Sequence, residues 1–118
     1  MTHHPVLSYT VEHHPEPTTQ LVVLKGKLVG SPEAYRLLEE TRDRIQEGQT
    51  RVCLVMDGVS MINSSGAGVI AAMYMSARRQ DGRLILAGVE ERSRKVLEFM
   101  HLNDFVQIVD TIGDAADA

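Results

Sequence analysis

Hydrophobic and polar residues along this chain follow two periodicities, one typical of strands and one typical of helices. Alternating or β-branched apolar runs predict strands at 6–12, 20–27, 51–56, 83–88 and 105–109. Apolar residues at helical spacing predict helices from Ser31 to about residue 47, at 66–79, at 91–101 and, in short form, within 110–118. The predicted order is β-β-α-β-α-β-α-β-α. Right-handed crossovers then predict an α/β fold with an N-terminal hairpin and a mostly parallel sheet that carries helices.

The opening segment predicts this hairpin and a capped helix. Residues 13–17, His-His-Pro-Glu-Pro, interrupt the first strand because proline has no backbone N–H for the sheet. Ser31 before Pro32 is a strong helix start, and Gly48 stands where a helix commonly ends. The first helix is expected to bury Ala34, Leu38, Thr41 and Ile45. The helix at 91–101 is expected to turn Val96, Leu97, Phe99 and Met100 inward.

The chemistry of the chain is concentrated in Asn63-Ser64-Ser65-Gly66-Ala67-Gly68, between an apolar strand and an alanine-rich helix. Asp57-Gly58 predicts a turn after the strand, so both serines are expected in a loop before a helix that begins at about Gly66. A serine at a helix N-terminus faces unpaired backbone N–H groups and the positive end of the helix dipole. Such a place accepts a phosphate, on a ligand or on the serine itself. The plainer alternative is two hydroxyls that only cap the helix.

Composition narrows the class of protein. The 118 residues are 43% hydrophobic with a formal charge of -4, which suits one core in one domain at 6–118 after a loose terminus at 1–5. The absence of a dense basic run argues against nucleic-acid and anionic-membrane binding. No signal peptide is expected at the N-terminus, and the most apolar helix is too short to span a bilayer. Cys53 is expected to be a buried, inert thiol. The sequence therefore predicts a soluble, cytoplasmic protein.

The sequence gives little support for a metal site or for a catalytic serine. His13 and His14, even with His3 and His4, have no cysteine or acidic partner at ligand spacing, so no metal is expected. Neither Ser64 nor Ser65 has the flanking glycines of a nucleophile elbow, so no catalytic residue is assigned.

Three further patterns have plain structural interpretations. Residues 66–71 match the dinucleotide fingerprint, but they lie past the midpoint of a short chain, where Gly66 and Gly68 are expected to allow close backbone packing. His101 is expected to act at a helix end. The basic residues between 78 and 95 alternate with acids and predict a solvated face.

Residues 56–70 resemble the signature of the STAS domain of bacterial anti-sigma factor antagonists. That signature is an apolar strand, an acid, a short turn, then Asp-Ser-(Ser/Thr)-Gly-x-Gly and a helix. Leu24-Lys25-Gly26-Lys27-Leu28 resembles the family's exit from its early hairpin, and residues 82–89 and 96–102 resemble its later strand and helix. The resemblance implies a STAS-like single domain and agrees with the predicted order of elements.

The resemblance also implies a function. In the family, the serine that matches Ser64 is phosphorylated by a partner that is both anti-sigma factor and kinase, an ATPase of histidine-kinase-like fold. The unphosphorylated antagonist sequesters this partner and frees a sigma factor, and a phosphatase reverses the modification. The domain itself has no catalytic activity and no cofactor. The expected contact surface comprises Asn63, Ser64, Ser65, Gly66, Ala67, Gly26, Leu28 and Gly30.

Two positions depart from the family pattern. Asn63 stands where the family usually has aspartate, and Val29 stands where an acid commonly follows the early Gly-x-Leu. An asparagine can cap the helix, but it carries no charge. Phosphorylation is therefore expected to be slower or differently governed than in the family. Two alternatives stay open: a STAS scaffold in a stress-signalling or lipid-transport assembly, and a nucleotide-binding module built on residues 66–71.

Overall fold

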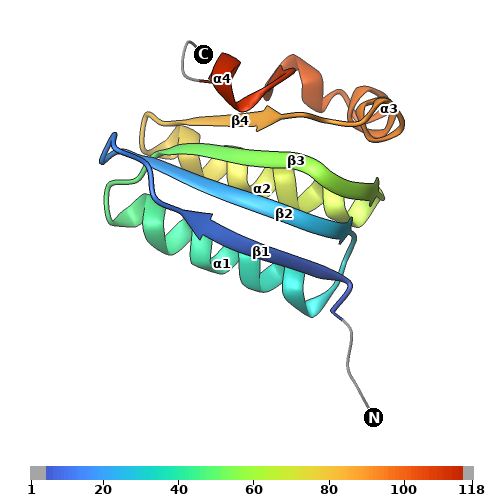
Figure 1. Cartoon of the computed structure of the whole chain (residues 1–118), viewed down its shortest axis with the longest axis horizontal. Coiled ribbons are helices and arrows are strands. Elements are labelled where there is room, and N and C mark those ends of the chain that lie inside the picture. The colour runs from blue at the N-terminus through green and yellow to red at the C-terminus, as the bar shows by residue number, and fades with distance from the viewer. Residues whose placement is uncertain (1–4, 116–118) are drawn as a thin grey trace.

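The computed structural model describes residues 5–115, which form an α/β domain with one mixed sheet. The strands are β1 (Leu7–Glu12), β2 (Thr19–Leu28), β3 (Arg51–Ile62), β4 (Arg83–Ala87) and β5 (Gln107–Val109). The helices are α1 (Pro32–Gln46), α2 (Ser64–Arg79), α3 (Glu91–Phe99) and α4 (Ile112–Ala115), with a 3-10 turn at Leu102–Asp104. The strands lie in sequence order (Figure 1). Only β1 and β2 pair antiparallel among the described strands, so the predicted hairpin and parallel sheet are confirmed.

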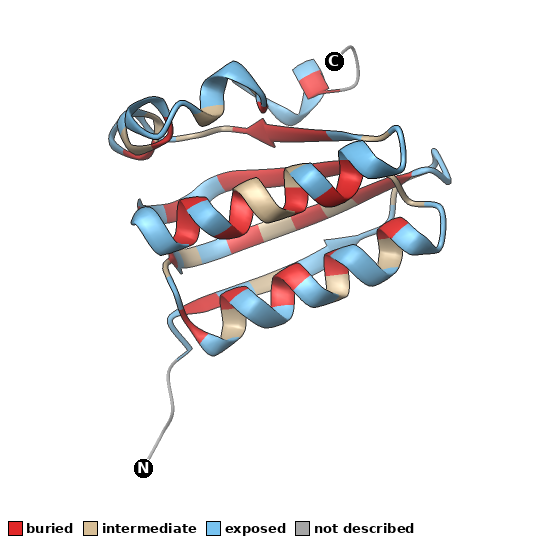
Figure 2. Cartoon of the chain, turned by 180° about the vertical axis from the view of Figure 1, so that it is seen from behind, coloured by how far each residue is buried: buried red, intermediate tan, exposed pale blue. Residues whose placement is uncertain are grey.

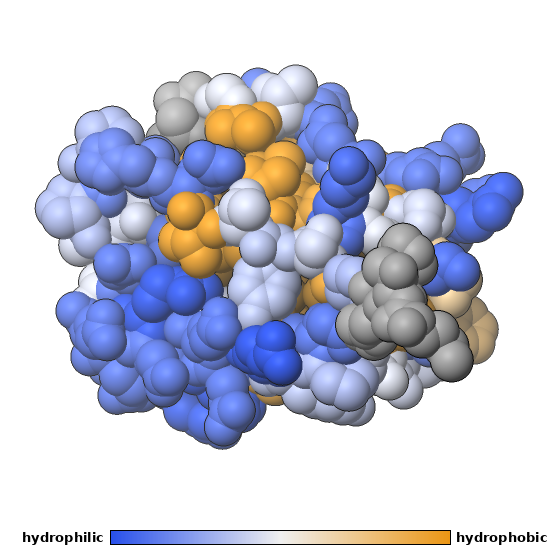
Figure 3. All heavy atoms as spheres, turned by 60° about the horizontal axis from the view of Figure 1, so that its bottom comes forward, coloured by the Kyte–Doolittle hydropathy of each residue, from blue (hydrophilic) through white to orange (hydrophobic). Residues whose placement is uncertain are grey.

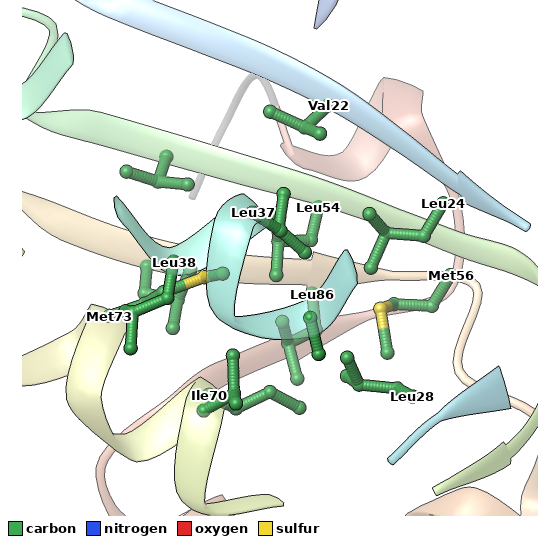
Figure 4. Packing of buried hydrophobic residues seen from close by; sticks show 14 of the residues in the cluster. Val22, Leu24, Leu28, Leu37, Leu38, Leu54, Met56, Ile70, Met73 and Leu86 are labelled. Carbon is green, nitrogen blue, oxygen red and sulfur yellow. The ribbon is translucent and has the colours of Figure 1, made fainter. Parts of the chain in front are cut away.

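The main core lies between the sheet and α1 and α2, which run side by side across one face (Figure 2). Alternate strand residues such as Leu24 and Leu54 meet Leu37 and Ile70 from these helices (Figure 4). Leu97 of α3 joins the same cluster. Each fully buried leucine or isoleucine of this kind contributes about 1.5–3 kcal/mol to the hydrophobic free energy of folding.

The opposite face of the sheet is only partly covered. Cys53, Ile85 and Ala87 pack there with Ala115 of α4, in a second, smaller cluster. Leu21 on the same face is half-buried. Seen from the lower edge, hydrophobic side chains remain visible over the sheet, above the polar surface of α1 (Figure 3).

Helix α1 begins and ends as the sequence predicts. The Ser31 hydroxyl accepts a hydrogen bond from the Ala34 N–H at 3.2 Å, and Pro32 is the first helical residue. At the other end Gly48 has φ +107°, a conformation that favours glycine. The four predicted core residues of α1 are all buried, together with Leu37.

The turn predicted at Asp57-Gly58 is wrong, because β3 continues without interruption to Ile62. The register with β2 shifts twice, and each time β3 carries one extra residue: Val23 to Lys25 spans Val55 to Gly58, and the second shift comes just after Gly26. Such bulges bend and twist a strand while pairing continues. A Cβ at Gly58 would lie 2.8 Å from the Leu24 carbonyl oxygen, so a glycine is needed for this close approach. The Asp57-Gly58 pair that predicted a turn therefore lies at a bulge within β3.

The expectations for α3 and the last strand need correction. Phe99 was expected to face inward, yet it is 86% exposed, and Met100 lies beyond the helix at 37% exposed. Phe99 follows Leu97 by two positions, which places it about 200° further around the helix from the buried Leu97. His101 ends α3 through its backbone, with φ 59° and its N–H donated to the Glu98 carbonyl. Strand β5 begins only at Gln107.

The terminal helix α4 forms with Thr111 as its cap, because the Thr111 hydroxyl accepts from the Asp114 N–H at 3.2 Å. The last part of the predicted segment, 116–118, and most of the predicted loose terminus, 1–4, lie outside the described residues. Within 5–115, no helix is both long and apolar enough to cross a membrane.

Candidate partner-binding site

The site is built where β3 passes directly into α2. Asn63 joins the two elements as the helix cap, in an extended conformation with φ -109° and ψ -177°. Its side-chain oxygen accepts from the Gly66 N–H at 2.9 Å, and its carbonyl accepts from the Ala67 N–H at 2.9 Å. The asparagine therefore does the capping that was considered for the serines, so the hydroxyls are not needed to start the helix.

Ser64 and Ser65 are the first two residues of α2, and the prediction that they lie in a loop before it is wrong. Both side chains are exposed, and neither hydroxyl donates to or accepts from any described residue. The N–H groups of the first turn have no partner inside a helix, and the dipole makes this end electropositive. Two free hydroxyls thus stand at a position that tolerates negative charge.

The end of β2 lies directly against this helix start. A Cβ on Gly66 would stand 1.8 Å from the Leu28 carbonyl oxygen, so the backbones of α2 and β2 touch at this point. The Asn63 N–H donates to the same carbonyl at 3.3 Å. One step further, a Cβ on Gly30 would come within 2.9 Å of the Ser65 Cβ. Leu28 and Gly30 are therefore brought together with Ser65 and Gly66 in one site, in which Gly30 and Ser65 are exposed while Leu28 and Gly66 are buried beneath them.

Gly26, which was predicted in the contact surface, and Gly68, which was predicted to allow close packing, have different surroundings. Gly26 pairs with Val59, further back along the sheet, and its φ of +113° with no side chain admits the Val6 carbonyl. Its described contacts are those of a strand position. Apart from its chain neighbours and the nearby backbone of α2, no described atom lies within 4 Å of where a Cβ on Gly68 would stand, so the expected close packing at Gly68 is wrong. Ala67 is fully buried and supports the helix start from beneath.

Tyr35 is a site neighbour that sequence reasoning missed. It is 53% exposed, and its hydroxyl oxygen lies 3.3 Å from the Cβ position at Gly30. Met61, 39% exposed, lies two residues before the cap on β3. The sequence could have indicated an exposed Tyr35, because this aromatic residue lies one turn after the Ser31 cap and outside the predicted apolar face of α1. The site therefore has an exposed apolar margin.

The other candidate chemistries find no support in the described residues. Cys53 is buried as predicted, and burial raises the pKa of its thiol, which disfavours a reactive thiolate. No group of three or more His, Cys, Asp or Glu within 5–115 is arranged to hold a metal ion. His14 accepts a hydrogen bond from the Glu16 N–H, while His3 and His4 lie outside the described residues.

The model of the STAS domain family matches residues 13–115. The chain belongs to the STAS domain family. A candidate anti-sigma factor antagonist of Thermotoga neapolitana is 32% identical over 73 residues, which are 62% of this chain and 65% of the relative. The aligned part thus spans just under two thirds of that relative.

Solved STAS structures share the fold. A candidate anti-sigma factor antagonist from Thermotoga maritima superposes with a TM-score of 0.78 at 24% identity, covering 92% of each chain. The anti-sigma factor antagonist SpoIIAA in its unphosphorylated form has a TM-score of 0.74 at 21% identity, covering 92% of this chain and 94% of its own. The phosphorylated form of SpoIIAA, from Bacillus, has a TM-score of 0.66 at 23% identity, covering 93% and 97%. At these identities the likeness shows the fold.

Proposed function

We propose that this STAS domain is an anti-sigma factor antagonist that binds an anti-sigma factor with serine kinase activity and is switched off by phosphorylation of Ser64. The observation that carries the proposal is the exposed Ser64 hydroxyl at the first position of α2, which has no hydrogen-bond partner among residues 5–115. The names of the relative from Thermotoga neapolitana and of SpoIIAA support the same role. The domain has no catalytic step of its own in this proposal. The kinase brings ATP, a phosphatase restores the serine, and all partners act in the cytoplasm.

The switch works through electrostatics at the helix start. A phosphate adds close to two negative charges and three acceptor oxygens. The α2 dipole and the N–H groups at the helix start that Asn63 does not engage stabilise those charges locally, and no acid stands in the first turn. A partner packed over Ser64 would instead desolvate a dianion without an opposite charge, which costs several kcal/mol. Phosphorylation therefore blocks binding while the fold persists.

Asn63 adjusts the rate of this modification. Its amide already holds the Gly66 N–H, so an aspartate at the same place would keep the cap and add a negative charge beside Ser64. If the family's acid orients the serine or the magnesium-bound ATP of the kinase, Asn63→Asp speeds phosphorylation. The test is the rate of phosphate incorporation by the purified kinase into the wild type and into Asn63→Asp.

The experiment that tests the function is capture of the tagged protein from its own cells, followed by intact and tandem mass spectrometry. A histidine-kinase-like ATPase in the bound fraction and a phosphate mapped to Ser64 in the unbound fraction are expected. Ser64→Ala should bind the kinase constitutively, whereas Ser65→Ala, the matched neighbour, should still be phosphorylated and released. If the tagged protein carries no phosphate and scaffold or transporter subunits are captured with it, the antagonist role is excluded in favour of a STAS scaffold.

A further inference from the structure

An aromatic pair, one ring exposed and one half-buried, lies toward the other end of α2. Phe105 follows the 3-10 turn and packs against Tyr74 of α2, with ring centroids 5.9 Å apart and planes inclined at 46°. Phe105 nevertheless remains 62% exposed, and the neighbouring Met75 is 47% exposed. Single exposed apolar residues are common on protein surfaces, but clustered ones mark interaction sites.

Two shallow hollows flank the Phe105 ring. The first is lined by Tyr74, Met75, Arg78, Asp104 and Phe105. The second is lined by Tyr74, Arg78, Gly82, Arg83, Leu84, Phe105 and Gln107. Because Tyr74, Arg78 and Phe105 line both, the two hollows form one continuous surface, which we call the Phe105 surface.

The Phe105 surface is positively charged on a chain whose formal charge is -4. Within residues 5–115, neither Arg78 nor Arg83 makes a salt bridge. The acid that lines the first hollow, Asp104, lies 3.8 Å from the His101 imidazole. Arg78 is also favoured by the negative end of the α2 dipole, but Arg83 is on strand β4 and gains nothing from it. An explanation by helix stability alone therefore leaves Arg83 and the exposed Phe105 unaccounted for.

We propose that the Phe105 surface binds an acidic segment of a partner protein that carries one apolar anchor residue. The anchor would pack on the Phe105 and Tyr74 rings, and carboxylates on either side would pair with Arg78 and Arg83. Guanidinium groups suit this role because they bind carboxylates through two parallel hydrogen bonds. The overall negative charge of the chain disfavours nucleic acid as the occupant.

This surface is separate from the Ser64 site. Arg78 comes 14 residues after Ser64 on α2, which corresponds to about 21 Å along the helix axis. The two sites therefore share no residue. The inference does not depend on phosphorylation of Ser64 or on the proposed antagonist function.

The test is selection of a random 12-residue peptide display library on the full chain, followed by fluorescence anisotropy with a labelled selected peptide. Enriched peptides should carry acids on both sides of an aromatic or aliphatic residue. Phe105→Ser and Arg83→Glu should each weaken binding of the peptide at least tenfold. Higher salt should also weaken its binding to the wild type. Arg92→Glu, an equal charge change on α3, and Ser64→Asp should each leave the affinity within twofold.

Several results would overturn the inference. These are enrichment of basic or purely apolar peptides, no enrichment at all, or an acidic peptide whose affinity survives both Phe105→Ser and Arg83→Glu. If Phe105→Ser fails to fold by circular dichroism, Arg83→Glu decides. Arg83 is exposed, and its only hydrogen bond outside the β3–β4 ladder among the described residues is from its backbone N–H to the Thr50 carbonyl, which Arg83→Glu leaves in place. A dimer in sedimentation equilibrium that Arg83→Glu dissociates would show that a second copy of the chain occupies the surface.

Discussion

A single methyl group at position 66 should separate the two backbones that form the candidate site. In Gly66→Ala the new Cβ would stand 1.8 Å from the Leu28 carbonyl oxygen, whereas real Cβ atoms essentially never come within 3.0 Å of an atom outside their own residue and its chain neighbours. The start of α2 and the end of β2 must therefore move apart by at least 1.2 Å, the difference between these two distances. Both are backbone segments held by hydrogen bonds, so neither can yield cheaply.

The expected cost follows from two effects. Overpacking of this kind costs about 1–3 kcal/mol. Displacing the helix start also strains the hydrogen bond from the Gly66 N–H to Asn63, and loss of a cap costs about 1 kcal/mol. These two effects sum to about 2–4 kcal/mol, and the helix propensity gained by alanine offsets about 0.5–1 kcal/mol of it. The free energy of unfolding should therefore fall by about 1–3 kcal/mol, which for a domain of this size corresponds to a Tm lower by about 4–12 °C.

The assay is urea unfolding followed by circular dichroism, with Gly68→Ala as the matched control. Both variants gain the same helix propensity, but the Cβ at position 68 meets nothing within 4 Å. Gly68→Ala should therefore raise the free energy of unfolding, by about 0.5–1 kcal/mol. If the two substitutions change the free energy of unfolding in opposite directions, the loss in Gly66→Ala can be assigned to the contact with Leu28. A Gly66→Ala protein as stable as the wild type would refute the reasoning.

Three further predictions concern single side chains. Asn63→Ala should lower the free energy of unfolding by about 1 kcal/mol in the same assay, because the Gly66 N–H loses its acceptor, and Asn63→Asp should not. Ser64→Asp should keep the wild-type Tm within a few degrees while it weakens kinase binding in a pulldown; a large loss of Tm would contradict the argument that the helix start tolerates charge. Burial and the hydrogen bond to Glu40 raise the pKa of Tyr9 to about 12, so the folded protein holds this proton more tightly than the unfolded chain, whose pKa is near 10.0. Stability from Tyr9 is thus complete below pH 10 and lost as the pH rises toward 12, a decline that urea titrations should find reduced in Tyr9→Phe.

The helix caps show how much local chemistry can predict. Ser31-Pro32 and Gly48 mark the two ends of α1 because capping depends on groups within a few residues of one another. The start of α2 was placed two residues late, since Asn63, Ser64 and Ser65 are all good caps and the sequence does not choose among them. The close approach of Leu28 to Gly66 decides which of the three residues is the cap. The Leu28 carbonyl accepts a hydrogen bond from the Asn63 N–H, and the Asn63 side chain then faces the first turn of α2.

Periodicity by itself determined the order of the strands and helices, the parallel sheet, the buried face of α1 and the segment that carries Ser64. These features follow from hydrophobic burial along one element and from the handedness of its connections. Only the tertiary structure decided that β3 continues through Gly58, that Gly66 rather than Gly68 is sterically required, and that Phe99 and Phe105 face outward. The physical reason is that bulges, backbone contacts and exposure depend on atoms from distant segments, which no local pattern contains.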